Sequence, residues 1–127
     1  MPRLITSPSD VAAVAELGAQ TDPRAAAQWL REALAADLRP FLPRAATPFL
    51  EVMPFDPQSD PQADPRYATA ADKQRVYEDM LGSAPLAQVV SIVPSRHFIP
   101  YDQPQALHDA LAVFIATLPT PTIPPSP

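Results

Sequence analysis

Two short apolar runs stand among four stretches in which apolar residues recur at helical spacing. Residues 47–53, TPFLEVM, and residues 89–93, VVSIV, have the length and the β-branched or aromatic content of buried strands. The helical pattern covers residues 9–20, 23–38, 65–81 and 103–118. The predicted order of elements is therefore helix, helix, strand, helix, strand, helix.

The connection between the two predicted strands contains a helix, and so long a crossover favours parallel pairing with a right-handed connection. The expected fold class is α/β, with two adjacent parallel strands and flanking helices. Both strands then end at the same edge of the sheet, where open α/β sheets carry their chemistry. One histidine, His97, stands in a polar turn after the second strand.

The turn that holds His97 is bounded on both sides. Pro94 ends the strand because it has no N–H for a ladder. Asp102 is expected to cap the following helix, with Pro104 in its first turn. Arg96, the neighbour of His97, is expected at the surface.

Residues 95–104 read SRHFIPYDQP. This segment resembles the end of the α/β-hydrolase family, where a subset reads S-R-H-F-I-x-x-D-Q-P around its catalytic histidine. Upstream, DPRAAAQWLREALAADLRP looks like the family's passage from the last cap helix into the body, and TPFLEVMPFDP resembles the penultimate strand and the loop that carries the catalytic acid. The resemblance covers about residues 20–117.

The resemblance implies a partial α/β-hydrolase fold with a division of the chain into four parts. Residues 9–46 would be cap-derived helices, and residues 47–118 the C-terminal part of the hydrolase. Residues 1–8 are expected to be a disordered lead, and residues 119–127, rich in proline, a disordered tail.

The resemblance also assigns two catalytic residues. His97 would be the base, and Asp56 the acid that orients its imidazole. The family's serine sits in G-x-S-x-G, but neither Gly18 nor Gly82 has a serine two residues away. The resemblance therefore implies a C-terminal fragment of an ester or related acyl hydrolase, inactive alone, which would meet an ester-like substrate only with a nucleophile-bearing half. No cofactor is implied.

Two other functions stay open. The chain could be one half of a split hydrolase, or a small non-catalytic α/β interaction module. Glu51 favours the module, because a carboxylate lies in mid-strand where a parallel strand takes an apolar residue. A metal site is not expected at Asp56, Asp60 and Asp64, since Tyr67 stands where an EF-hand needs its bidentate glutamate.

The composition of the chain limits the classes of partner that it is expected to bind. The net charge of −5 and the absence of a basic patch argue against nucleic acid. No apolar run approaches the length of a membrane span, and no signal peptide precedes the first helix, so a cytoplasmic protein without membrane contact is expected. Trp29 is expected in the core. A two-stranded sheet buries a thin core, so self-association is also expected.

Overall fold

The computed structural model describes residues 4–119. Within these residues helices predominate, and two strands form the sheet. The helices and strands are α1 (Pro8–Ala19), α2 (Pro23–Ala35), the 3-10 helix η1 (Arg39–Arg44), β1 (Phe49–Pro54), α3 (Asp60–Ala63), the 3-10 helix η2 (Pro65–Tyr67), α4 (Ala70–Leu81), β2 (Ala87–Ile92), α5 (Ile99–Asp102) and α6 (Pro104–Thr117).

The two strands pair in parallel, as the sequence predicts. The register runs from Phe49 opposite Ala87 to Pro54 opposite Ile92. The first strand begins two residues later than predicted, after Pro48. The second begins two residues earlier, where the peptide N–H of Phe49 donates to the carbonyl of Leu86 at 3.3 Å. The mixed α/β class is therefore confirmed.

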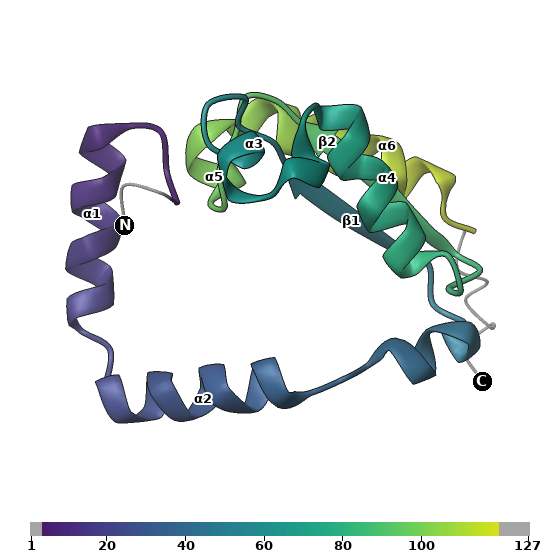
Figure 1. Cartoon of the computed structure of the whole chain (residues 1–127), viewed down its shortest axis with the longest axis horizontal. Helices are drawn as coiled ribbons and strands as arrows, with labels where there is room; N and C mark the ends of the chain where they lie inside the picture. The colour runs from purple at the N-terminus through teal and green to yellow at the C-terminus, as the bar shows by residue number, and fades with distance from the viewer. Residues whose placement is uncertain (1–3, 120–127) are drawn as a thin grey trace, which may run out of the picture.

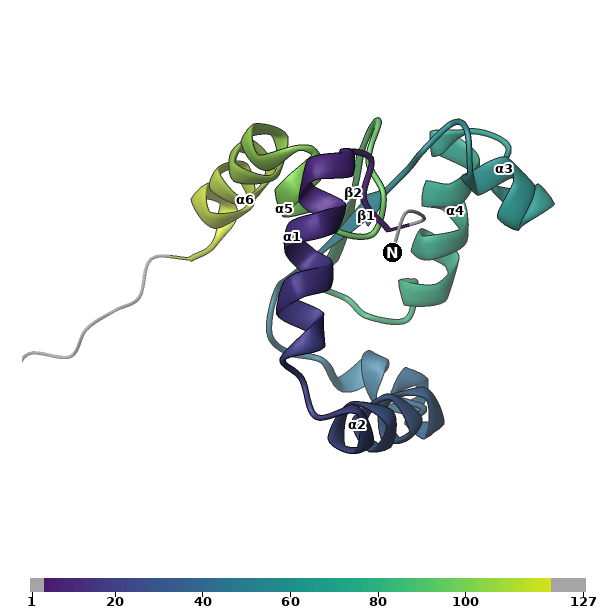
Figure 2. The same cartoon turned by 90° about the vertical axis from the view of Figure 1, so that its left-hand side faces the viewer.

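Helices cover both faces of the sheet. Helix α4 lies on one face and α6 on the other (Figures 1 and 2). Helix α4 begins at a cap, because the Thr69 hydroxyl accepts from the N–H of Asp72, so the predicted stretch 65–81 divides into η2 and α4. The small core gathers at the carboxyl end of the sheet and is made mainly of Met53, Phe55, Ile92 and Ile99.

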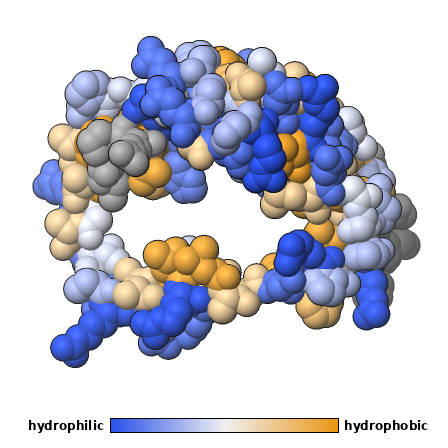
Figure 3. All heavy atoms as spheres, viewed as in Figure 1, coloured by the Kyte–Doolittle hydropathy of each residue, from blue (hydrophilic) through white to orange (hydrophobic). Residues whose placement is uncertain are grey.

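The N-terminal helices stand away from this body. Helices α1 and α2 form an arm that leaves the sheet and returns to it through η1, with an open hollow between α2 and the body (Figures 1 and 3). Helix α2 has no buried residue, and Trp29 is 69% exposed. The expectation of Trp29 in the core is therefore wrong. The apolar residues of α2 recur at helical spacing and form a stripe, but no described element covers that stripe.

The chain before α1 differs from the expected disordered lead. Pro8 already belongs to α1, and Ile5 is only 1% exposed. The carbonyl of Leu4 accepts from the N–H of Phe98 at 3.0 Å. Residues 4–6 are thus fixed on the turn that follows β2. Residues 120–127 of the expected tail lie outside the described residues. Between residues 4 and 119, no helix is both long and apolar enough to cross a membrane.

Candidate functional site

The predicted acid, Asp56, lies directly after β1 at the carboxyl edge of the sheet. Its residue is 5% exposed. Oδ1 accepts from the N–H of Gln58 at 3.0 Å, and Oδ2 accepts from the hydroxyl of Ser59 at 3.1 Å. These local bonds form a turn that holds the carboxylate toward the end of β2, as an aspartate in a tight turn commonly does.

Arg96 is the main partner of this carboxylate. Its Nε donates to Oδ2 of Asp56 at 2.5 Å, and the two side chains are only 22% and 8% exposed. Burial alone would raise the pKa of Asp56. The hydrogen bonds from Arg96, Gln58 and Ser59 outweigh it, so the pKa is lowered. Asp56 is thus an ionised carboxylate in a largely buried ion pair, and the expectation of Arg96 at the surface is wrong.

The predicted base, His97, lies on the same edge but is exposed. Its ring meets the Phe98 ring edge-on, with centroids 5.0 Å apart. Asp56 and His97 line one polar pocket of about 200 Å³. Over residues 4–119 no hydrogen bond joins them, and the Asp56 carboxylate turns to Arg96 instead. The structure brings the two predicted residues to one pocket without pairing them.

Lys73 is a buried cation in this pocket that the sequence reading missed. Its Nζ donates to the carbonyl of Pro54 at 2.7 Å and lies 3.0 Å from Oδ2 of Asp60. The same Asp60 oxygen accepts from the N–H of Asp56 at 2.8 Å. The helical spacing could have indicated its burial, because Lys73 lies between Ala70 and Tyr77 on the inward-facing side of α4.

Asp102 links the N-terminal segment to Arg96 through hydrogen bonds. Its Oδ1 accepts from the N–H and the hydroxyl of Thr6, at 2.8 and 2.7 Å, and its Oδ2 accepts from the N–H of Arg96 at 2.8 Å. The guanidinium of Arg96 also donates to the carbonyl of Ile5 at 3.3 Å. Asp102 is therefore a clamp between two chain segments, and its expected role as a helix cap is wrong.

The backbone explains why that cap does not form. The short helix α5 begins at Ile99, has Pro100 in its first turn and runs through Asp102. Helix α6 then starts at Pro104, after Gln103, whose side chain makes no cap bond. Asp102 is left inside a helical turn, with its carboxylate directed to the turn that holds Arg96.

No group of three or more His, Cys, Asp or Glu side chains that could hold a metal occurs within residues 4–119. The three aspartates with Asp-Pro spacing are used in other ways. Asp56 pairs with Arg96, Asp60 with Lys73, and Asp64 accepts from the N–H of Arg66 at the start of η2.

No protein-family model, curated protein or solved structure matches this chain. The α/β-hydrolase resemblance therefore rests on the sequence motifs alone.

Proposed function

We propose that this chain supplies the acid and the base of an α/β-hydrolase-type acyl-transfer site, and that the serine nucleophile comes from another segment or another chain. One observation carries the proposal. Asp56 and His97, far apart in sequence, follow adjacent parallel strands and line the same pocket. That is the arrangement expected of the family's acid and base. The arm of α1 and α2, which stands off the body, agrees with helices derived from a cap.

The chemistry needs a proton acceptor beside a hydroxyl. The exposed imidazole of His97 is open to a serine that approaches from outside, and it would take the serine proton as the oxygen attacks an ester carbonyl. Asp56 would then have to leave Arg96 to orient the imidazole. In the described arrangement the Asp56 carboxylate is paired with Arg96, so the acid and the base are not aligned for this chemistry.

A fluorophosphonate probe tests the proposal, because it labels only activated serines. The purified chain is added to an extract of source cells in which its own gene has been deleted, and the extract is then labelled. We expect a labelled protein that appears with the native chain and with the His108→Ala variant, and that disappears with His97→Ala. His108 is the matched control, since it is exposed on α6 and outside the pocket. Labelling independent of His97, or none, would overturn the proposal.

The second candidate is a non-catalytic binding module, and the Arg96–Asp56 pair favours it. A catalytic acid has to be available to its histidine, whereas this carboxylate is already neutralised by a cation and by two local donors. On this reading the pair holds the two strand ends together. The free edge of β1 would then be the binding surface.

A further inference from the structure

The outer edge of β1 is open to another strand. The N–H groups of Phe49 and Phe55 donate to the carbonyls of Leu86 and Ile92 on the β2 side. Peptide groups alternate between the two sides of a strand in a parallel sheet. Those of Leu50 and Val52 therefore point outward. The sheet has no third strand among residues 4–119, so these four groups are available for a ladder.

Two prolines limit the length of this edge. Pro48 and Pro54 have the same parity as Leu50 and Val52, so each presents its ring where a ladder needs an N–H. The carbonyl of Pro54 is already taken by Lys73 at 2.7 Å. A strand can therefore pair only with Leu50 and Val52, and Glu51 stands at the centre of that pairing.

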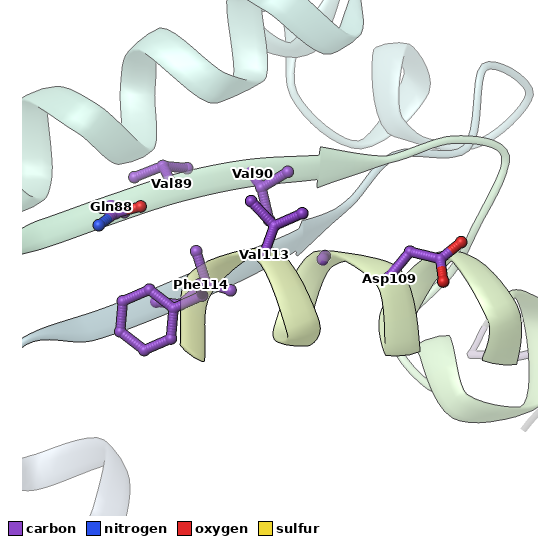
Figure 4. A pocket seen from close by; sticks show the side chains of 8 residues that line it. Gln88, Val89, Val90, Asp109, Val113 and Phe114 are labelled. Atoms are coloured by element: carbon purple, nitrogen blue, oxygen red, sulfur yellow. The ribbon is translucent and has the colours of Figure 1, made fainter. Parts of the chain in front are cut away.

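The two faces of this short edge differ in chemistry. Leu50 faces α6 and lines an apolar groove of about 420 Å³ with Val90, Val113 and Phe114 (Figure 4). Glu51 projects to the other face, toward α4, where its charge contributes to the raised pKa of Tyr77 after the larger effect of that residue's burial. An added strand would therefore meet an apolar surface on one side and a carboxylate on the other.

A second copy of the chain is a poor occupant of this edge. In an antiparallel pair around a two-fold axis, the register that uses only Leu50 and Val52 places Glu51 directly opposite its own copy. Like charges in that position destabilise a sheet. The neighbouring registers set Pro48 or Pro54 against a peptide group of the copy. The edge is thus protected from self-pairing.

We propose that the β1 edge binds an extended segment of a partner protein, with Lys or Arg opposite Glu51 and an apolar residue on each side of it. The basic side chain would pair with Glu51 on the α4 face. Its apolar neighbours would project to the α6 face, beside Leu50 and Val52 and next to the groove. The hollow beside β1 leaves room for such a segment (Figure 3). This proposal deepens the binding-module candidate and is independent of acyl chemistry.

Two capped synthetic peptides test it, Thr-Val-Lys-Val-Thr and Thr-Val-Glu-Val-Thr. Each is titrated into the ¹⁵N-labelled full chain, and the amide shifts of Leu50 and Val52 are followed. We expect the lysine peptide to bind with a Kd at least about fivefold lower than the glutamate peptide, because opposite charges replace like charges across the edge. Amides that face β2, such as that of Phe49, should shift less.

Variants of one residue complete the test. Glu51→Gln should make the two peptides bind alike, and Glu51→Lys should reverse their order. His97→Ala should leave both affinities unchanged, so a failure here is distinct from a failure of the hydrolase proposal. Equal Kd values for the native chain, or no shift at Leu50 and Val52 with either peptide, would overturn the proposal.

Discussion

Arg96 Nε lies 2.5 Å from Asp56 Oδ2, so the predicted catalytic acid is bound to the residue next to the predicted base. Arg96 and His97 are adjacent in the turn after β2, and the interpretation of the pocket depends on which of them pairs with Asp56. If Asp56 pairs with His97, the pocket has an oriented base, and if it pairs with Arg96, the pocket has a structural ion pair. The clamp at Asp102 supports the second arrangement, because it fixes the backbone N–H of Arg96.

Replacing Arg96 by Ala should destabilise the fold. The Asp56 carboxylate would stay buried with two weaker donors, and loss of one partner of a buried ion pair costs about 3–5 kcal/mol. Arg96 is 22% exposed, so water can replace part of its contribution. We expect the free energy of unfolding at pH 7 to fall by about 2 kcal/mol in urea titrations.

The control is Arg66→Ala, since Arg66 pairs with Asp64 at the surface with a side chain that is 67% exposed. It should change the urea midpoint far less than Arg96→Ala does. Combining Arg96→Ala with Asp56→Asn should cost less than the sum of the two single changes, because they remove the same interaction. Equal effects of Arg96→Ala and Arg66→Ala would contradict the assignment.

Stability should fall with acid through two carboxyl groups. Burial would raise the pKa of Asp102, but donation from Thr6 and from the N–H of Arg96 outweighs burial, and its pKa is lowered, as is that of Asp56. A folded-state pKa below the unfolded one means that the unfolded chain binds more protons. The stabilisation is therefore complete above the usual value of 3.8 and is lost as the pH falls through the folded values.

Urea titrations between pH 7 and pH 2 would measure this loss. The Asp56→Asn and Asp102→Asn variants should be less stable than the native chain at pH 7 and should lose less on acidification. Asp64→Asn is the comparison: its hydrogen bonds from Arg66 also lower the pKa of Asp64, but the Arg66 side chain is 67% exposed, so this change should alter the acid dependence less. An unchanged dependence on pH in both buried-site variants would show that other groups control acid unfolding.

The hydrogen bonds to Asp102 should help to hold the N-terminal segment, in addition to the burial of Ile5. Thr6→Val keeps the shape of the side chain and removes the hydroxyl that donates to Oδ1 at 2.7 Å. We expect the free energy of unfolding to fall by about 1 kcal/mol. The amide of Phe98 should also exchange faster, because its acceptor, the carbonyl of Leu4, lies in the released segment. Thr117→Val, whose hydroxyl bonds within α6, should leave that exchange rate unchanged.

The sequence predicted the features that depend on local pattern. The β-branched run at Val89 and Val90 and the crossover helix were enough for two parallel strands. The ion pair of Asp56 and Arg96 was not predictable, because it joins residues forty positions apart and competes with a neighbouring histidine for one carboxylate. The attachment of residues 4–6 to the turn after β2 was not predictable either, since a short segment before a helix has no periodicity.

Opposite charges at position 51 of two copies should turn the protected edge into a heterodimer interface. In the central antiparallel register, Leu50 and Val52 of each copy can form a ladder, and Glu51 faces its counterpart. The native chain and the Glu51→Lys variant should each resist pairing through this edge, because like charges meet in both. An equimolar mixture should form a heterodimer, since the Lys at position 51 of one copy then faces Glu51 of the other.

Sedimentation velocity of the two separate proteins and of the mixture would measure this. A mass increase confined to the mixture, and reduced by added salt, is the expected outcome, because the charge pair is partly exposed and therefore screened. The Glu51→Gln variant mixed with the native chain is the control and should not gain mass in the same way. If the native chain alone dimerises as readily as the mixture, the carboxylate does not protect this edge, and the exposed apolar stripe of α2, which includes Trp29, becomes the surface to test for self-association.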